Sequence, residues 1–115
     1  MANPVTHFEI QGSDGAKSQE FYRSLFGWEI DANNPMAYGM VSKGADNGIG
    51  GGVTAAMNKP MVTFYVEVED LAATLAKAEA QGGTKLMDPM DVPGGPTIAM
   101  FADPDGNAIG IMKGM

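Results

Sequence analysis

The chain has 115 residues, contains no cysteine and carries a formal net charge of −7. The absence of cysteine excludes disulfides, thiolate metal sites and cysteine nucleophiles, and an acidic balance without a cluster of Lys or Arg argues against nucleic acid or membrane partners. No apolar run approaches the roughly 18 residues of a membrane span, and the polar N-terminal sequence is unlike a signal peptide, so we expect a cytoplasmic, single-domain protein.

The first half of the chain opens with a pattern typical of a strand followed by a helix. Residues 5–11 alternate between two faces, as in a half-buried strand. The apolar face carries Thr6, Phe8 and Ile10, and the other face carries His7, Glu9 and Gln11. The apolar face should pack against a helix that begins after Asp14 and ends at Gly27. The helical stripe expected to face the core consists of Phe21, Tyr22, Leu25 and Phe26.

Three strands are predicted after this helix, at about residues 28–31, 36–42 and 48–55. Asn, Pro and Gly residues between them favour turns. The run Gly50-Gly51-Gly52 lacks the lysine and the strand-to-helix context of a phosphate-binding loop. We therefore expect it to permit the close approach of strands or subunits.

The second half of the chain repeats this order. A strand is predicted at residues 62–68, followed by a helix that Asp70 caps and that Gly82 and Gly83 end. The apolar side of that helix carries Leu71, Leu75 and Ala78. Further strands are predicted at about residues 84–88, 96–102 and 108–112. Pro89 is expected in the loop between the first two of them.

The two halves read as copies of one pattern. Phe8 corresponds to Phe64 and Ile10 to Val66, so the offset is 56 residues, and all four side chains should point toward the helices. We predict an internal duplication within one domain, because one copy alone would leave its apolar face in water. The modules would span about residues 1–56 and 57–115 of the single domain 1–115. The predicted fold class is α+β with two βαβββ modules, helices on one face of the strands and a polar-lined concavity on the other.

Two motifs at opposite ends of the chain connect this pattern to a known family. The opening motif comprises His7, Asp14, Phe21, Tyr22 and Phe26-Gly27-Trp28, and the closing motif comprises Asp103 to Asn107 followed by Ile109 to Met112. Together they resemble the vicinal oxygen chelate superfamily, which includes glyoxalase I, bleomycin-resistance proteins and extradiol dioxygenases. The glycine-rich stretch 49–53 and the Gly82-Gly83 helix end are similar to a compact glyoxalase-like subgroup.

The resemblance also implies where a metal site would lie. In metal-dependent members the ligands come from the first and last strands of each module, and here those positions fall at His7, Thr54, Thr63 and Gly110. The position of Thr54 depends on the 56-residue offset across a glycine-rich strand. Of the four, only His7 is a good ligand for a transition metal. We therefore expect no metal and no other cofactor.

The predicted function is binding of a small, partly apolar organic molecule in the concave face, as in the resistance-type members of the family. The predicted ligand-binding residues are His7, Glu9, Thr54, Thr63, Tyr65, Gly110 and Met112, and Tyr38 and Met40 can join them from the third strand. His7 is the only histidine, so chemistry that needs a group titrating near neutrality would depend on it.

Two alternatives remain open at this point. The chain can be an enzyme of the same superfamily, an isomerase, lyase or dioxygenase that uses His7 with partners such as Glu9 or Glu67. Alternatively, the module mainly mediates association. A homodimer is expected in either case, since a small two-module sheet leaves edges that a symmetric partner can cover.

Overall fold

The computed structural model describes residues 2–114 of the chain. These residues form two compact units. The first unit is Thr6–Thr63, and the second unit combines residues 2–5 with residues 64–114. None of the helices within residues 2–114 is long and apolar enough to cross a membrane.

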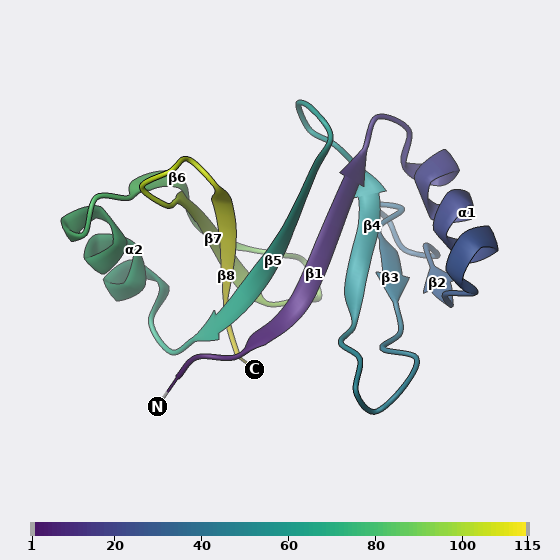
Figure 1. The fold of residues 1–115 in the computed structure, drawn as a ribbon, viewed down its shortest axis with the longest axis horizontal. Coiled ribbons are helices and arrows are strands. Elements are labelled where there is room, and N and C mark those ends of the chain that lie inside the picture. The colour runs from purple at the N-terminus through teal and green to yellow at the C-terminus, as the bar shows by residue number, and fades with distance from the viewer. Residues whose placement is uncertain (1, 115) are drawn as a thin grey trace. The chain divides into compact units, whose positions relative to one another are not determined.

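The first unit contains one helix and four strands. Its elements are β1 (Val5–Gly12), α1 (Gly15–Phe26), β2 (Ile30–Asp31), β3 (Gly39–Val41) and β4 (Gly51–Ala55). The strands are ordered β2-β3-β4-β1. β1 and β4 are parallel, and the other neighbouring strands are antiparallel. Helix α1 packs beside β4 on one side of these strands (Figure 1).

The second unit has the same order of elements. They are β5 (Met61–Val68), α2 (Leu71–Ala80), β6 (Thr84–Asp91), β7 (Thr97–Ala102) and β8 (Ala108–Lys113). The strands are ordered β5-β8-β7-β6, with β5 parallel to β8. Helix α2 packs against β6, β7 and β8 (Figure 1). The βαβββ order and the α+β class predicted from the sequence are therefore confirmed.

Both helices begin at the predicted caps. The Asp14 carboxylate accepts from the Lys17 backbone N–H at 3.1 Å, and the Asp70 carboxylate accepts from the Ala73 backbone N–H at 2.9 Å. Each carboxylate satisfies a donor that has no partner inside its own helix. Gly27 ends α1 in the left-handed conformation with a φ of 69°, which a glycine adopts without a Cβ clash.

Each unit has its own apolar core. In the first, Ile30, Val41 and Val53 are buried, with Phe8, Ile10, Tyr22 and Trp28 packed against them. In the second, Val68, Leu71, Leu75, Ala99 and Ile111 are buried, with Val66 and Phe101 packed against them. The predicted inward faces of β1 and β5 are thus confirmed for three residues, Phe8, Ile10 and Val66. Phe64 is 39% exposed and lies outside the core cluster.

The predicted core-facing stripe of α1 is wrong. Phe21, Leu25 and Phe26 are 58%, 59% and 58% exposed, whereas Gln19 is only 5% exposed. The Gln19 side-chain amide donates to the Val53 carbonyl at 2.9 Å and to the Ala37 carbonyl at 3.1 Å. A polar clamp therefore fixes which side of α1 faces the strands.

Several strand boundaries also differ from those expected. β2 and β3 are shorter than predicted, while β6 continues through Pro89, which was expected in a loop. The pairing of β6 with β7 shifts register between Met87 and Met90. Proline lacks the N–H that a strand interior needs, and an irregular strand at the end of the strand order accommodates it.

Candidate functional site

The side of β1 away from α1 carries the polar residues His7, Glu9 and Gln11. Strand alternation places them opposite Phe8 and Ile10, which pack into the core of the first unit. Glu9 is 8% exposed, and His7 and Gln11 are half-buried. A carboxylate so withdrawn from water needs hydrogen-bond partners to remain charged.

Tyr38 joins these residues from the loop between β2 and β3. The Asn34 side chain holds this loop, because its Oδ1 accepts from the Tyr38 N–H at 2.9 Å and its Nδ2 donates to the Tyr38 carbonyl at 2.7 Å. The preceding Ala37 is the non-glycine residue with a positive φ, 52°, among those that the structure describes. Such a conformation costs about 1 kcal/mol or more, and the Gln19 clamp on the Ala37 carbonyl maintains it. Backbone strain therefore contributes to the placement of the Tyr38 ring.

The four side chains form one hydrogen-bonded array. The Tyr38 hydroxyl donates to Glu9 Oε1 at 2.9 Å, and the Gln11 amide donates to Glu9 Oε2 at 2.7 Å. His7 Nε2 lies 2.9 Å from the Tyr38 oxygen. Since the phenol has one proton and gives it to Glu9, His7 must donate through Nε2–H. We call this set, His7, Glu9, Gln11 and Tyr38, the polar array.

A glycine on the neighbouring strand makes room for the array. Gly52 on β4 is the register partner of Glu9. A Cβ atom at Gly52 would overlap the hydroxyl group and Cζ of Tyr38. Only glycine at this position lets the phenol reach both His7 and Glu9.

The pKa of His7 gives a test of this environment. Burial lowers the pKa of His7 below the ordinary value of 6.5, although the charge of Glu9 opposes the shift. In the pH range between the two values the unfolded chain binds more protons at this site, so the histidine contributes stability that is present above about pH 6.5. This contribution is lost as the pH falls toward the folded-state pKa.

We therefore expect the single histidine signal in proton NMR to titrate with a midpoint below 6.5 in the folded protein. The free energy of unfolding should fall more steeply below that pH in the wild type than in His7→Gln, which cannot titrate there. A midpoint at or above the ordinary value would contradict the buried placement of the imidazole.

In the second unit, a tyrosine covers the predicted glycine position. Tyr65 is 5% exposed and is the register partner of Gly110 on β8. A Cβ at Gly110 would lie 2.5 Å from Tyr65 Cδ2, so the ring occupies the space that a longer side chain would need. Met112, two residues along β8, is half-buried and pairs with Glu67. Thr63, the other predicted residue of β5, is 5% exposed.

The strand register changes one inherited position. Tyr65 pairs with Gly110, and Glu9, which precedes Tyr65 by 56 residues, pairs with Gly52 rather than with Thr54. Gly52 and Gly110 are 58 residues apart, because the second half holds two more residues between its paired strands (110 − 52 = 58, compared with 65 − 9 = 56). Thr54 pairs with Gln11. Its role in ligand binding stays a prediction.

The residues at the inherited ligand positions do not fit a metal ion. Gly52 and Gly110 offer no side-chain donor, and Thr63 offers only a hydroxyl. His7 Nε2 donates to Tyr38, so that nitrogen is not an available lone pair in this arrangement. Within residues 2–114, no group of three or more His, Cys, Asp or Glu residues is arranged to hold a metal ion.

The structure thus brings His7 and Glu9 together, whereas Tyr65, Gly110 and Met112 form a separate set in the second unit. The sequence analysis named Tyr38 only as a residue that can join, and it did not assign a role to Gln11. Gln11 could have been found, since it follows His7 and Glu9 on the same alternating face. The bridging role of Tyr38 depends on a loop conformation that no local pattern indicates.

Comparison with known proteins places the chain in a family. The family model of the Glyoxalase/Bleomycin resistance protein/Dioxygenase superfamily matches residues 5–111. A putative glyoxylase, CFP32 of Mycobacterium bovis, is 30% identical over 91% of this chain and 43% of its own length. The anthracycline biosynthesis protein DauV of Streptomyces sp. strain C5 is 30% identical over 92% of this chain and 45% of its own length. The chain therefore spans less than half the length of these curated relatives.

A solved structure agrees with this assignment. A glyoxalase/bleomycin resistance protein/dioxygenase superfamily member from Vibrio splendidus 12B01 superposes with a TM-score of 0.66 at 17% sequence identity. The superposition covers 98% of this chain and 100% of the other, so the likeness extends over the whole fold. The chain belongs to the Glyoxalase/Bleomycin resistance protein/Dioxygenase superfamily.

Proposed function

We propose that the chain binds a small, partly apolar organic molecule at the polar array on β1, without a metal ion at the inherited positions. The observation that carries this proposal is the connected set of hydrogen bonds from His7 through Tyr38 to Glu9. Small-molecule sites usually combine a few fixed polar groups with apolar or aromatic surface. The Tyr38 ring and the bare strand position Gly52 supply such surface beside the array.

The polar groups of the array are fixed before a ligand arrives. Both oxygens of Glu9 are held, one by Tyr38 and one by Gln11. The lowered pKa of His7 keeps the imidazole mainly neutral at pH 7. A neutral imidazole and a phenol are suited to carbonyl and hydroxyl groups rather than to a strongly charged ligand. Binding to prearranged groups costs less conformational entropy than binding to mobile ones.

The choice of ligand class draws on a relative. DauV is named for anthracycline biosynthesis, and anthracyclines are flat polycyclic compounds that carry ketone and hydroxyl groups. These features match an aromatic surface with neutral hydrogen-bonding groups. Contacts from Thr54, Thr63, Tyr65, Gly110 and Met112 remain part of the proposal, as does assembly into a homodimer.

We expect daunorubicin, a fluorescent anthracycline, to bind the purified protein saturably in a fluorescence anisotropy titration. Tyr38→Phe should weaken binding roughly three- to ten-fold, the equivalent of losing one well-placed hydrogen bond. Tyr22→Phe is the matched control, because it removes a hydroxyl from the core side of the same unit, where the ring stacks on Trp28.

Equal affinities of the two variants would place the ligand elsewhere, and the binding proposal at the array would fail. The same incubations distinguish a binding module from an enzyme. A change in the mass of the probe that occurs with wild type and stops with His7→Gln would assign catalysis to the array. An unchanged probe released intact from all variants would support binding alone.

A further inference from the structure

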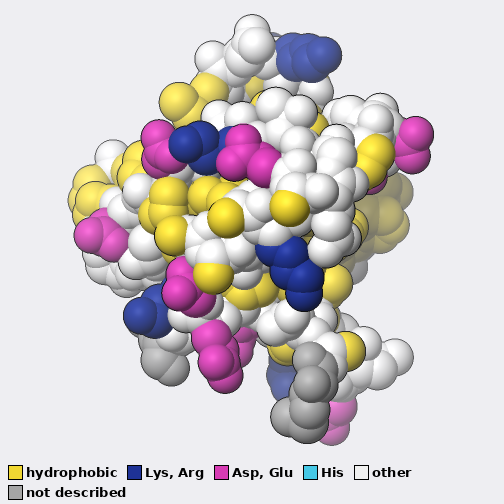
Figure 2. Space-filling view, turned by 90° about the vertical axis from the view of Figure 1, so that its left-hand side faces the viewer, with side chains coloured by type: hydrophobic (Ala, Val, Ile, Leu, Met, Phe, Trp, Pro, Cys, Tyr) yellow, Lys and Arg dark blue, Asp and Glu magenta, His cyan; other side chains and the backbone are white. Residues whose placement is uncertain are grey.

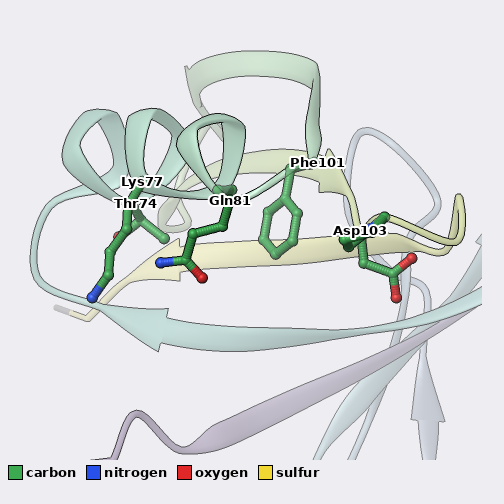
Figure 3. Close-up of a pocket in the computed structure, with 8 residues that line it drawn as sticks. Thr74, Lys77, Gln81, Phe101 and Asp103 are labelled. Atoms are coloured by element: carbon green, nitrogen blue, oxygen red, sulfur yellow. The ribbon is translucent and has the colours of Figure 1, made fainter.

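A second recess lies in the second unit, between the last turns of α2 and the end of β7. Its volume is about 300 Å³, and it shares no residue with the polar array. Lys77 and Gln81 of α2, Phe101 of β7 and Asp103 of the following turn line it. Figure 3 shows Lys77, Gln81 and Phe101 in a row, with Asp103 at the end away from Lys77. Figure 2 looks onto the α2 side, where apolar side chains lie among acidic and basic ones.

The recess has an aromatic floor and firmly held walls. Phe101 packs against the core of the second unit and is half-buried, so part of its ring remains open to the recess. Gly83 brings the helix end close to β7, since a Cβ there would lie 2.8 Å from the Ala102 carbonyl oxygen and 3.0 Å from that of Ala78. The turn after β7 is fixed because the Asp103 carboxylate accepts from Asp105 and Asn107.

The polar groups of the recess differ in what they have left to offer. Asp103 uses both carboxylate oxygens within its own turn. The Thr74 hydroxyl donates to the Asp70 carbonyl at 2.8 Å, so its proton is already engaged. Within residues 2–114, the Lys77 ammonium and the Gln81 side-chain amide have no protein partner. The open groups are therefore donors, one of them positively charged, on the same helix and beside an aromatic ring.

We propose that this recess binds a flat aromatic carboxylate, with its ring on Phe101 and its carboxylate at Lys77 and Gln81. The charged donor and the amide N–H match the acceptor oxygens of a carboxylate. The ring supplies an apolar contact that a small inorganic anion could not use. Because the chain as a whole carries a net charge of −7, attraction of the anion depends on Lys77 locally and weakens as ionic strength rises.

The test uses 2-naphthoate with ¹⁵N-labelled wild-type protein in NMR titrations. We expect saturable shifts of backbone signals in α2, at the end of β7 and in the following turn. The uncharged 2-naphthamide should bind at least about three-fold more weakly, as expected for an exposed ion pair. Lys77→Gln should weaken naphthoate binding by a similar factor, and Phe101→Leu roughly three- to ten-fold.

Lys59→Gln is the matched control, since Lys59 is an exposed lysine of the first unit, and its affinity should equal that of the wild type. The ¹⁵N spectrum of each variant shows whether it remains folded. Equal effects of Lys77→Gln and Lys59→Gln, or no saturable shifts at millimolar naphthoate, would overturn the proposal. Shifts confined to β1 and β4 would also overturn it and would assign the probe to the polar array instead.

Discussion

Gln19→Ala should lower the free energy of unfolding by about 2 to 4 kcal/mol, because it leaves two carbonyl groups without their donor. Those carbonyls belong to Val53, which is fully buried in β4, and to Ala37, which precedes Tyr38. Urea denaturation with an unchanged slope would report this loss as a change in stability alone. Gln19→Leu should cost a similar amount although it preserves side-chain volume, which separates the hydrogen bonds from packing.

Phe21→Ala, on the same helix, is the control for this effect. Its side chain is 58% exposed, and we expect a loss below about 1 kcal/mol, as for other surface substitutions. If Phe21→Ala were as damaging as Gln19→Ala, α1 would pack through its aromatic stripe after all. Gln19→Ala should also disturb the polar array, since the Ala37 carbonyl that it releases adjoins Tyr38. A shift in the His7 titration midpoint would detect that disturbance.

Local chemistry made much of the fold predictable. The alternation in β1 and the caps Asp14 and Asp70 depend on residues close together in the chain, so the sequence alone identifies them. The orientation of α1 could not be found this way. Apolar periodicity assumes that a helix buries its large apolar residues, whereas Gln19 faces the strands because of two carbonyl groups that come from distant segments.

The candidate site was predictable only where it follows one strand. His7 and Glu9 share a face of β1 by alternation, and the structure brings them together. Tyr38 reaches them through a loop whose conformation depends on Asn34 and Gln19. The equivalence of Gly52 with Gly110 required the strand register, since loops between paired strands differ in length and break a constant offset.

We expect Gly52→Ala to act through Tyr38. The new methyl group would take the place of the phenol hydroxyl, and the half-exposed Tyr38 can swing outward from its loop. Glu9 would then keep only the hydrogen bond from Gln11, and His7 would lose its partner on the ring nitrogen. The free energy of unfolding should fall by about 1 to 3 kcal/mol. The pKa of His7 should rise toward its ordinary value as water enters.

A double-mutant cycle separates this mechanism from a general strain on β4. Tyr38→Ala alone already removes the hydroxyl and leaves nothing for the methyl group at position 52 to displace. The double substitution should therefore cost less than the sum of the single ones by about 1 kcal/mol or more. Gly50→Ala, in the same glycine run but beside the Val41 carbonyl at 3.1 Å, should combine additively with Tyr38→Ala, within roughly 0.5 kcal/mol. Additivity at Gly52 as well would mean that this glycine does not serve to admit the phenol, and the geometry of the polar array would need another cause.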